Sequence, residues 1–230
     1  MKKFVLLLGA LFAGGLALSA QTGDDAFAHA RRFNLSIQGG PTLSLYENAF
    51  SYRDNGRSFD LIKAQAALSL GYDFTEAFGL RLQAAYGADA GAANTRQTAG
   101  GGFYPYTFKH VNGFVDAVLN LCGLKGVATA FRPRIYAGVG GAYTFGFTDA
   151  HHPWQKIFDR NTSFGFRAGF IAEYTTTSGL GFFADLCGEA YTDLYNGLAP
   201  SAEDQKAYEG YAGYPFDLRG ILSLGLVYYF

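Results

Sequence analysis

A two-residue alternation of apolar and small polar side chains runs through this sequence and constrains its fold more than any other feature. In the first segment, Phe33, Leu35 and Ile37 alternate with Asn34 and Ser36. Because successive side chains of an extended strand point to opposite faces, this segment is predicted to be a β-strand with one apolar and one polar face. The pattern marks eight segments, at residues 33–45, 63–74, 80–86, 110–121, 134–147, 163–174, 180–189 and 218–230.

The connections between these segments alternate in length. Residues 75–78, 122–131 and 175–178 form short or moderate links, whereas residues 47–59, 89–105, 148–160 and 193–216 are long and polar. Strands joined in this way run antiparallel, with the short turns at one end of the sheet and the long loops at the other. An even number of strands returns both termini to the end with the short turns.

A soluble sandwich or lipocalin would also show alternation, but its polar face would meet water. Here that face is dominated by glycine, alanine and serine with isolated charges, which suits a narrow lumen. Aromatic residues gather near the strand ends, as in the interfacial girdles of membrane barrels. They are Tyr72, Phe74, Tyr174, Tyr228 and Phe230 at one end, and Tyr86, Tyr143, Phe145, Phe147, Phe164 and Phe166 at the other.

After the N-terminal segment there is no apolar run of 18 residues, which excludes a helical membrane protein. In hydrocarbon every backbone N–H and C=O must be paired, so membrane strands are viable only in a closed sheet. We therefore predict an all-β fold, an eight-stranded antiparallel up-and-down transmembrane β-barrel.

The N-terminus is predicted to be an export signal. Lys2 and Lys3 precede an apolar stretch that runs to about Leu18, and the small residues Ser19 and Ala20 offer a cleavage site. The predicted organisation is a cleaved signal peptide at 1–20, a short periplasmic segment at 21–32 and an outer-membrane barrel at 33–230. Without the two signal lysines, 16 of the 18 basic residues remain against 19 acidic ones. The resulting charge of about −3 argues against a nucleic-acid partner.

The two cysteines are predicted to be unpaired. Cys122 falls in a short turn and Cys187 in the middle of a strand. This layout holds them farther apart than a disulfide allows.

The sequence ends in a polar residue, a glycine and alternating aromatics, at Ser223, Gly225, Tyr228 and Phe230. This ending resembles the C-terminal assembly signal of outer-membrane barrels. The resemblance implies two partners during biogenesis, the barrel-insertion machinery and periplasmic chaperones.

The whole pattern resembles the OmpA-like and OmpX-like small barrels of Gram-negative outer membranes. The segment 112–121 and the following segment 134–141 look like that family, and the likeness covers about residues 33 to 230. It implies a monomer in the outer membrane, in contact with its lipid and with both termini in the periplasm. The chain is expected to end at the barrel, without a peptidoglycan-binding domain.

Strand parity also sorts the charged residues, and it places five cations and five anions in the lumen. They are Lys63, Arg81, Arg134, Arg167 and Arg219, with Asp73, Asp116, Glu173, Asp185 and Glu189. Because an eight-stranded barrel is just wide enough for side chains to fill it, we expect an ion-pair network that closes the lumen. The alternative is a small-solute, porin-like channel in which these charges form a constriction.

An outer-membrane hydrolase is a second alternative, which the sequence disfavours. Asp149 and His151 resemble one dyad of the omptin proteases, but the second aspartate pair of those enzymes is missing. No histidine has the His-x-Ser partner of the lipid A deacylases. His151 and His152 alone supply too few ligands for a metal ion. We expect no enzyme activity, no metal and no cofactor.

The loops are the remaining place for a function. The fourth long loop is rich in aromatic residues, which often recognise ligands when a rigid scaffold presents them. These residues are Tyr191, Tyr195, Tyr208, Tyr211, Tyr214 and Phe216. The sequence therefore favours a structural or surface-interaction role, with an extracellular ligand bound by the loops; packing of these rings on the barrel rim is the alternative.

Overall fold

The computed structural model describes residues 32–45, 61–94, 103–126, 129–148, 159–192, 195–197 and 216–230. The predicted signal peptide, the segment 21–31 and most of the four long loops lie outside these residues. Among the described residues, no helix is long and apolar enough to cross a bilayer.

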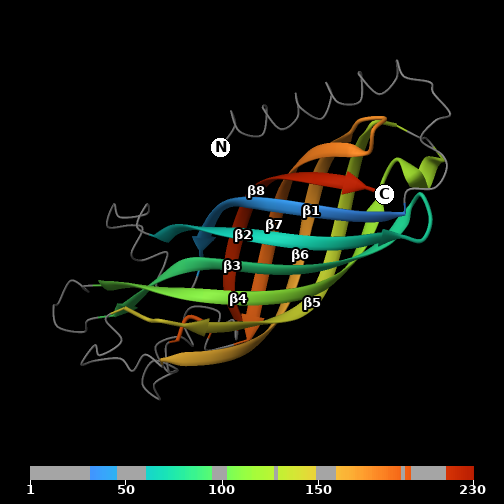
Figure 1. Cartoon of the computed structure of the whole chain (residues 1–230). Helices are drawn as coiled ribbons and strands as arrows, with labels where there is room; N and C mark the ends of the chain where they lie inside the picture. The colour runs from blue at the N-terminus through green and yellow to red at the C-terminus, as the bar shows by residue number, and fades with distance from the viewer. Residues whose placement is uncertain are drawn as a thin grey trace, which may run out of the picture.

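The described chain forms eight antiparallel strands in one closed barrel (Figure 1). The strands are β1 (Phe33–Ser44), β2 (Ile62–Asp73), β3 (Phe78–Asn94), β4 (Phe103–Asn120), β5 (Phe131–Phe145), β6 (Arg160–Thr175), β7 (Leu180–Thr192) and β8 (Phe216–Tyr229). Each strand pairs with its neighbours in sequence, and β8 pairs with β1 to close the sheet. The predicted fold class is confirmed.

Strand parity separates two environments. In β1 the side chains of Phe33, Leu35 and Ile37 are exposed on the outside of the barrel, whereas Asn34 and Ser36 are buried within it. The same alternation continues around the barrel. The apolar rows therefore face outward, and the polar rows fill the interior.

Register fixes the tilt of the strands. A hydrogen-bonded row that starts at Asn34 passes through every strand to Arg219 and returns to β1 at Ser44, ten residues further along. Such a stagger requires tilted strands and sets a narrow barrel diameter. A row of paired residues therefore shifts along the barrel axis as it passes from strand to strand.

The two ends of the barrel differ. At one end, here called the terminal end, the amide of Phe230 donates to the carbonyl of Phe33, and the three short turns close the hairpins. One of these turns contains the short 3-10 helix η3 (Gly123–Lys125) and Cys122. Cys122 and the buried Cys187 are both free thiols, as predicted. At the opposite end, here called the loop end, the strands lead into the four long connections.

Several strands extend further toward the loop end than the sequence predicts. β3 reaches Asn94 and β4 starts at Phe103, so Asp89 lies in a strand and not in a loop. Tyr191 likewise lies in β7. In β3 the segment after Tyr86 is nearly all glycine and alanine. The sequence therefore shows no alternation in this segment, although its pairing with β4 continues to Asn94.

The predicted position of Phe147 in the outer girdle is wrong. Gly146 has a φ of 65° and interrupts the alternation. The ring of Phe147 instead packs inside the barrel mouth, with its centroid 4.8 Å from that of Phe108.

Candidate functional site

One hydrogen-bonded row contains five of the charged lumen residues. The row passes from Arg81 in β3 through Asp116, Gly138, Arg167 and Glu189 to Arg219 in β8. Positive and negative groups therefore alternate across six adjacent strands, interrupted only by a glycine. Every one of these charged side chains is buried, so each needs an opposite charge as its partner.

Asp116 is the centre of this row. Its carboxylate accepts from Nε and Nη2 of Arg167, both at 2.6 Å, and from Nε of Arg81 at 2.7 Å. Arg81 also approaches Asp185 of β7, with 3.6 Å between Nη1 and Oδ2. Since β3 and β7 lie on opposite sides of the barrel, this pair bridges the lumen. Tyr136 completes the layer by donating to Asp185 at 2.8 Å.

Arg219 organises a second cluster nearer the loop end. Its guanidinium donates to Glu189 at 2.7 Å and to Asp89 at 2.8 Å. His110 contacts both Arg219 and Asp89, with its Nε2 3.1 Å from Nη1 of Arg219 and its Nδ1 3.2 Å from Oδ2 of Asp89. Tyr195 donates its hydroxyl to Asp89 at 2.6 Å. Residues from separate strands and from the chain after β7 thus meet in one buried group.

Tyr195 and Asn196 fold back into the mouth of the barrel. The rings of Tyr191 and Tyr195 stack with their centroids 4.1 Å apart. Tyr106 donates to the carbonyl of Asn196 at 2.7 Å, and the amide of Asn196 donates to Asp217 at 2.9 Å. Tyr191 and Tyr195 are 0% exposed, so for these two rings the alternative of packing at the barrel rim is correct, and ligand recognition by exposed rings is not.

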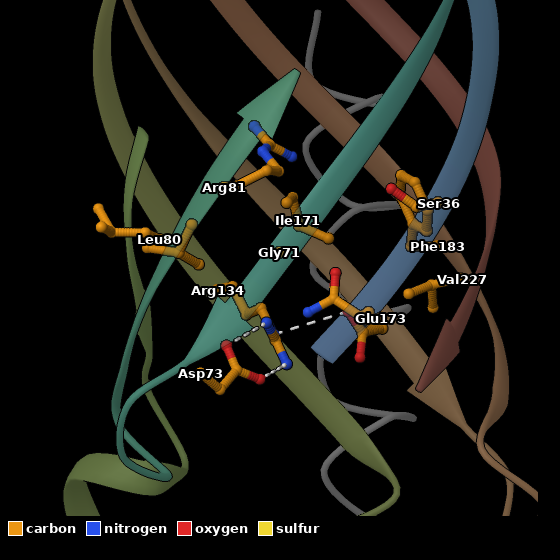
Figure 2. A pocket seen from close by; sticks show the side chains of 12 residues that line it. Ser36, Gly71, Asp73, Leu80, Arg81, Arg134, Ile171, Glu173, Phe183 and Val227 are labelled. Atoms are coloured by element: carbon orange, nitrogen blue, oxygen red, sulfur yellow. Dashed lines mark hydrogen bonds and ion pairs between the residues drawn. The ribbon is translucent and has the colours of Figure 1, made fainter. Parts of the chain in front are cut away.

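A third cluster lies at the terminal end (Figure 2). Arg134 projects between Asp73 and Glu173, with nitrogen to oxygen distances of 3.3 and 3.6 Å. It also donates to the hydroxyl of Tyr229 at 2.7 Å, and Tyr229 donates to Glu173 at 2.7 Å. The neighbouring cavity, whose lining includes Ser36, measures about 30 Å³. This volume admits no more than a few water molecules.

Glycines on the inner face make room for the large lumen side chains. A Cβ at Gly165 would lie 2.8 Å from the ring of Tyr191. A Cβ at Gly138 would lie 2.6 Å from the carbonyl oxygen of Val115 and would also meet the carboxylate of Asp116. The small polar face predicted from the sequence is therefore filled by side chains from neighbouring strands.

The structure brings nine of the ten sequence-predicted lumen charges into ion pairs. Lys63 is the exception: it is half-buried in β2 and makes no ion pair with another described residue. The predicted lumen network did not include Asp89, His110 or Tyr195, which belong to the Arg219 cluster. If the predicted third strand had been extended past Tyr86, its alternation would have placed Asp89 in the lumen. Nothing in the sequence indicates that Tyr195 folds back into the barrel.

The four residues of the predicted assembly signal divide between the two faces. Ser223 and Gly225 face the lumen, and Tyr228 and Phe230 are exposed on the outside. The ring of Phe230 stacks on Phe33 at 6.1 Å, beside the seam between β8 and β1.

The described residues contain no group of histidine, cysteine and carboxylate side chains that could hold a metal ion. Asp149, His151 and His152 lie outside the described residues, as do Tyr208, Tyr211 and Tyr214. His110 is completely buried, so no substrate in solution can reach it in this conformation.

No protein-family model and no curated relative matches the sequence. Neisserial surface protein A is similar in structure, with a TM-score of 0.51, 14% identity and coverage of 86% of this chain and 97% of that chain. A major outer membrane protein from Thermus thermophilus has a TM-score of 0.49, 14% identity and coverage of 88% and 100%. OprG from Pseudomonas aeruginosa has a TM-score of 0.47, 17% identity and coverage of 90% and 99%. The closed eight-stranded sheet and the match to Neisserial surface protein A together establish that this chain has the fold of the small outer-membrane β-barrels.

Proposed function

We propose that this chain is a monomeric outer-membrane barrel whose lumen is closed by side chains and which serves as a rigid scaffold for its surface loops. The observation that carries the proposal is the ion-paired row from Arg81 to Arg219. Its side chains are buried, and Arg81 reaches across the lumen to Asp185. The cavity beside Arg134 measures about 30 Å³.

The outer surface supports a membrane location. Large apolar side chains cover the strands on the outside, and Leu224 is 70% exposed. A contiguous apolar surface of this extent is unfavourable in water but is what hydrocarbon requires. Each strand has at least 12 residues, more than the 9–11 that a tilted strand needs to cross the bilayer core.

The lumen contacts favour closure over a porin-like pore. Opening a passage would separate Arg81 from Asp185 across the barrel and Arg219 from Asp89 at the loop end. Each separation would remove the arginine from a buried carboxylate, Asp185 or Asp89, and loss of one partner of a buried ion pair is strongly unfavourable. The stacked rings of Tyr191 and Tyr195 occupy the mouth as well.

A binding role in place of catalysis is the function that this scaffold supports best. The described lumen charges are engaged mainly with one another inside the barrel, and the long loops at one end are the segments that a closed barrel can present to a partner. Deletion of residues 201–214 is expected to leave folding intact and to abolish binding to other cells. Unchanged binding by the deletion variant would contradict a recognition role for this loop.

Conductance tests the closed lumen directly. We expect the refolded protein to show no long-lived open state in planar bilayers. Lys125→Gln, a change in an exposed turn, should behave in the same way. Frequent long openings in the unmodified protein would establish the porin-like alternative. Cleavage of a peptide panel by the purified barrel, lost in His151→Ala, would instead establish a hydrolase.

A further inference from the structure

Among the described side chains, the outward face of the eight strands has only two charged positions, and both lie in one row. Lys109 of β4 pairs with Phe145 of β5, and Phe145 pairs with Arg160 of β6. Both charged side chains are exposed. The other described side chains of this face are uncharged, and the carboxylates of the described strands point inward.

The spacing of the two cations suits one shared anion. Adjacent strands lie about 4.7–4.9 Å apart, so the backbones of Lys109 and Arg160 are roughly 10 Å apart, with the ring of Phe145 between them. Both side chains are long enough to reach a single group above that ring. Arginine and lysine N–H groups are strong donors to phosphate oxygens.

The row lies at the loop-end edge of the apolar belt. Tyr143, the next outward residue of β5, stacks on Phe145 with its ring centroid 5.6 Å away. The cations therefore stand where an aromatic girdle gives way to the polar boundary of a bilayer. This is the depth at which lipid phosphates lie.

A shallow trough runs below the row on the same strands. Gly113 and Gly141 pair with each other on the outward face, and Ala84 continues the small row in β3. Bulkier residues lie above and below them, at Val111, Tyr143, Val115 and Val139. A Cβ at Gly113 would meet nothing closer than 3.9 Å, so this part of the surface is open.

We propose that Lys109 and Arg160 bind the phosphate of one lipid and that an acyl chain of that lipid lies in the trough at Gly113 and Gly141. This inference rests on the proposed membrane location. The competing explanation is that the two cations are interfacial anchors that contact headgroups without selectivity. Anchors would be expected around the whole circumference, whereas both cations here lie within three adjacent strands and flank one ring.

Lipid retention measured by native mass spectrometry tests the site. The full-length mature barrel, refolded in detergent, is incubated with phosphatidic acid or with phosphatidylcholine of the same acyl chains. Lys109→Gln, Arg160→Gln and the double variant remove the cations, and Gly113→Leu fills the trough. Lys125→Gln removes an exposed cation at the terminal end and is the matched control. Heat-dependent gel migration verifies that every variant is folded.

We expect phosphatidic acid to be retained at least about tenfold better than phosphatidylcholine. Each single glutamine variant should weaken phosphatidic acid retention by about tenfold, as expected for one charge-assisted contact. Gly113→Leu should weaken the retention of both lipids, and Lys125→Gln should change nothing.

Equal retention of the two lipids, or retention unaffected by the glutamine variants, would overturn the site and leave the barrel assignment intact. Displacement of phosphatidic acid by millimolar inorganic phosphate would show a free-phosphate site and would also overturn the proposal. Failure of the unmodified chain to insert into vesicles would instead overturn the proposed function.

Discussion

Replacement of Arg219 by methionine tests how strongly the lumen depends on its ion pairs. Methionine keeps much of the volume of the side chain but removes the guanidinium. The carboxylates of Asp89 and Glu189 would lose donors at 2.8 and 2.7 Å, in a site where the arginine side chain is completely buried. We expect a large loss of stability from a single substitution.

The contacts that remain set the size of the loss. Hydrogen bonds to charged groups contribute about 1.5–3 kcal/mol each, and removal of one partner from a buried pair costs about 3–5 kcal/mol. Asp89 keeps the hydroxyl of Tyr195 at 2.6 Å, and Glu189 keeps that of Tyr191 at 2.6 Å. The expected decrease in the free energy of unfolding is therefore near the lower end of that range, at about 3 kcal/mol.

The assay is reversible urea unfolding of the barrel in phospholipid vesicles, followed by circular dichroism and gel migration. Lys125→Met, in an exposed turn, is expected to shift the unfolding free energy by less than about 0.5 kcal/mol. Combination of Arg219→Met with Glu189→Gln should cost less than the sum of the two single changes, since the unpaired charge is then removed.

A loss below about 1 kcal/mol for Arg219→Met would refute this reasoning. It would mean that water reaches both carboxylates once the arginine is gone. The lumen would then be a hydrated passage and not a closed core.

Three further predictions concern the two faces and the C-terminus. Gly138→Ala should destabilise the barrel by about 1–3 kcal/mol in the same assay, because the new methyl group meets the adjacent strand, whereas Gly220→Ala, which meets open space, should be neutral within about 0.5 kcal/mol. Leu224→Arg should lower the free energy of unfolding in vesicles by about 2–4 kcal/mol, since it places a charge on the lipid face. Leu124→Arg, in an exposed turn, should leave that free energy almost unchanged, and equal losses for the two variants would contradict the membrane belt. Phe230→Ala should lower the folded fraction in cell membranes several-fold, as measured by heat-dependent gel migration, with little effect on the purified barrel; normal assembly would count against the C-terminal signal.

Strand parity predicted most of this barrel because one physical rule governs it. Side chains alternate between two environments, so Phe33, Leu35 and Ile37 in one strand are enough to assign its faces. The same rule sorted charges such as Arg81 and Asp116 to the interior before any contact was known.

The sequence did not predict the parts of the structure where the alternation of apolar and polar side chains is absent or is interrupted. The end of β3 could not be assigned from the sequence, because the residues around Asp89 are small and neither face of the strand is distinctly apolar. The positive φ of Gly146 turns Phe147 inward. A two-residue alternation cannot predict this change of face. The return of Tyr195 into the mouth depends on partners in other strands, so only the three-dimensional structure reveals it.

In this barrel the outward rows of side chains are expected to contact lipid, while the inward rows pair with one another. Spin labels at Leu68, Val139 and Leu224, in a background with Cys122→Ser and Cys187→Ala, test it in reconstituted bilayers through their relative accessibility to oxygen and to a water-soluble nickel chelate. We expect high oxygen access and low nickel access at all three positions. Access to the nickel chelate, or immobilised labels shielded from both reagents, would contradict it.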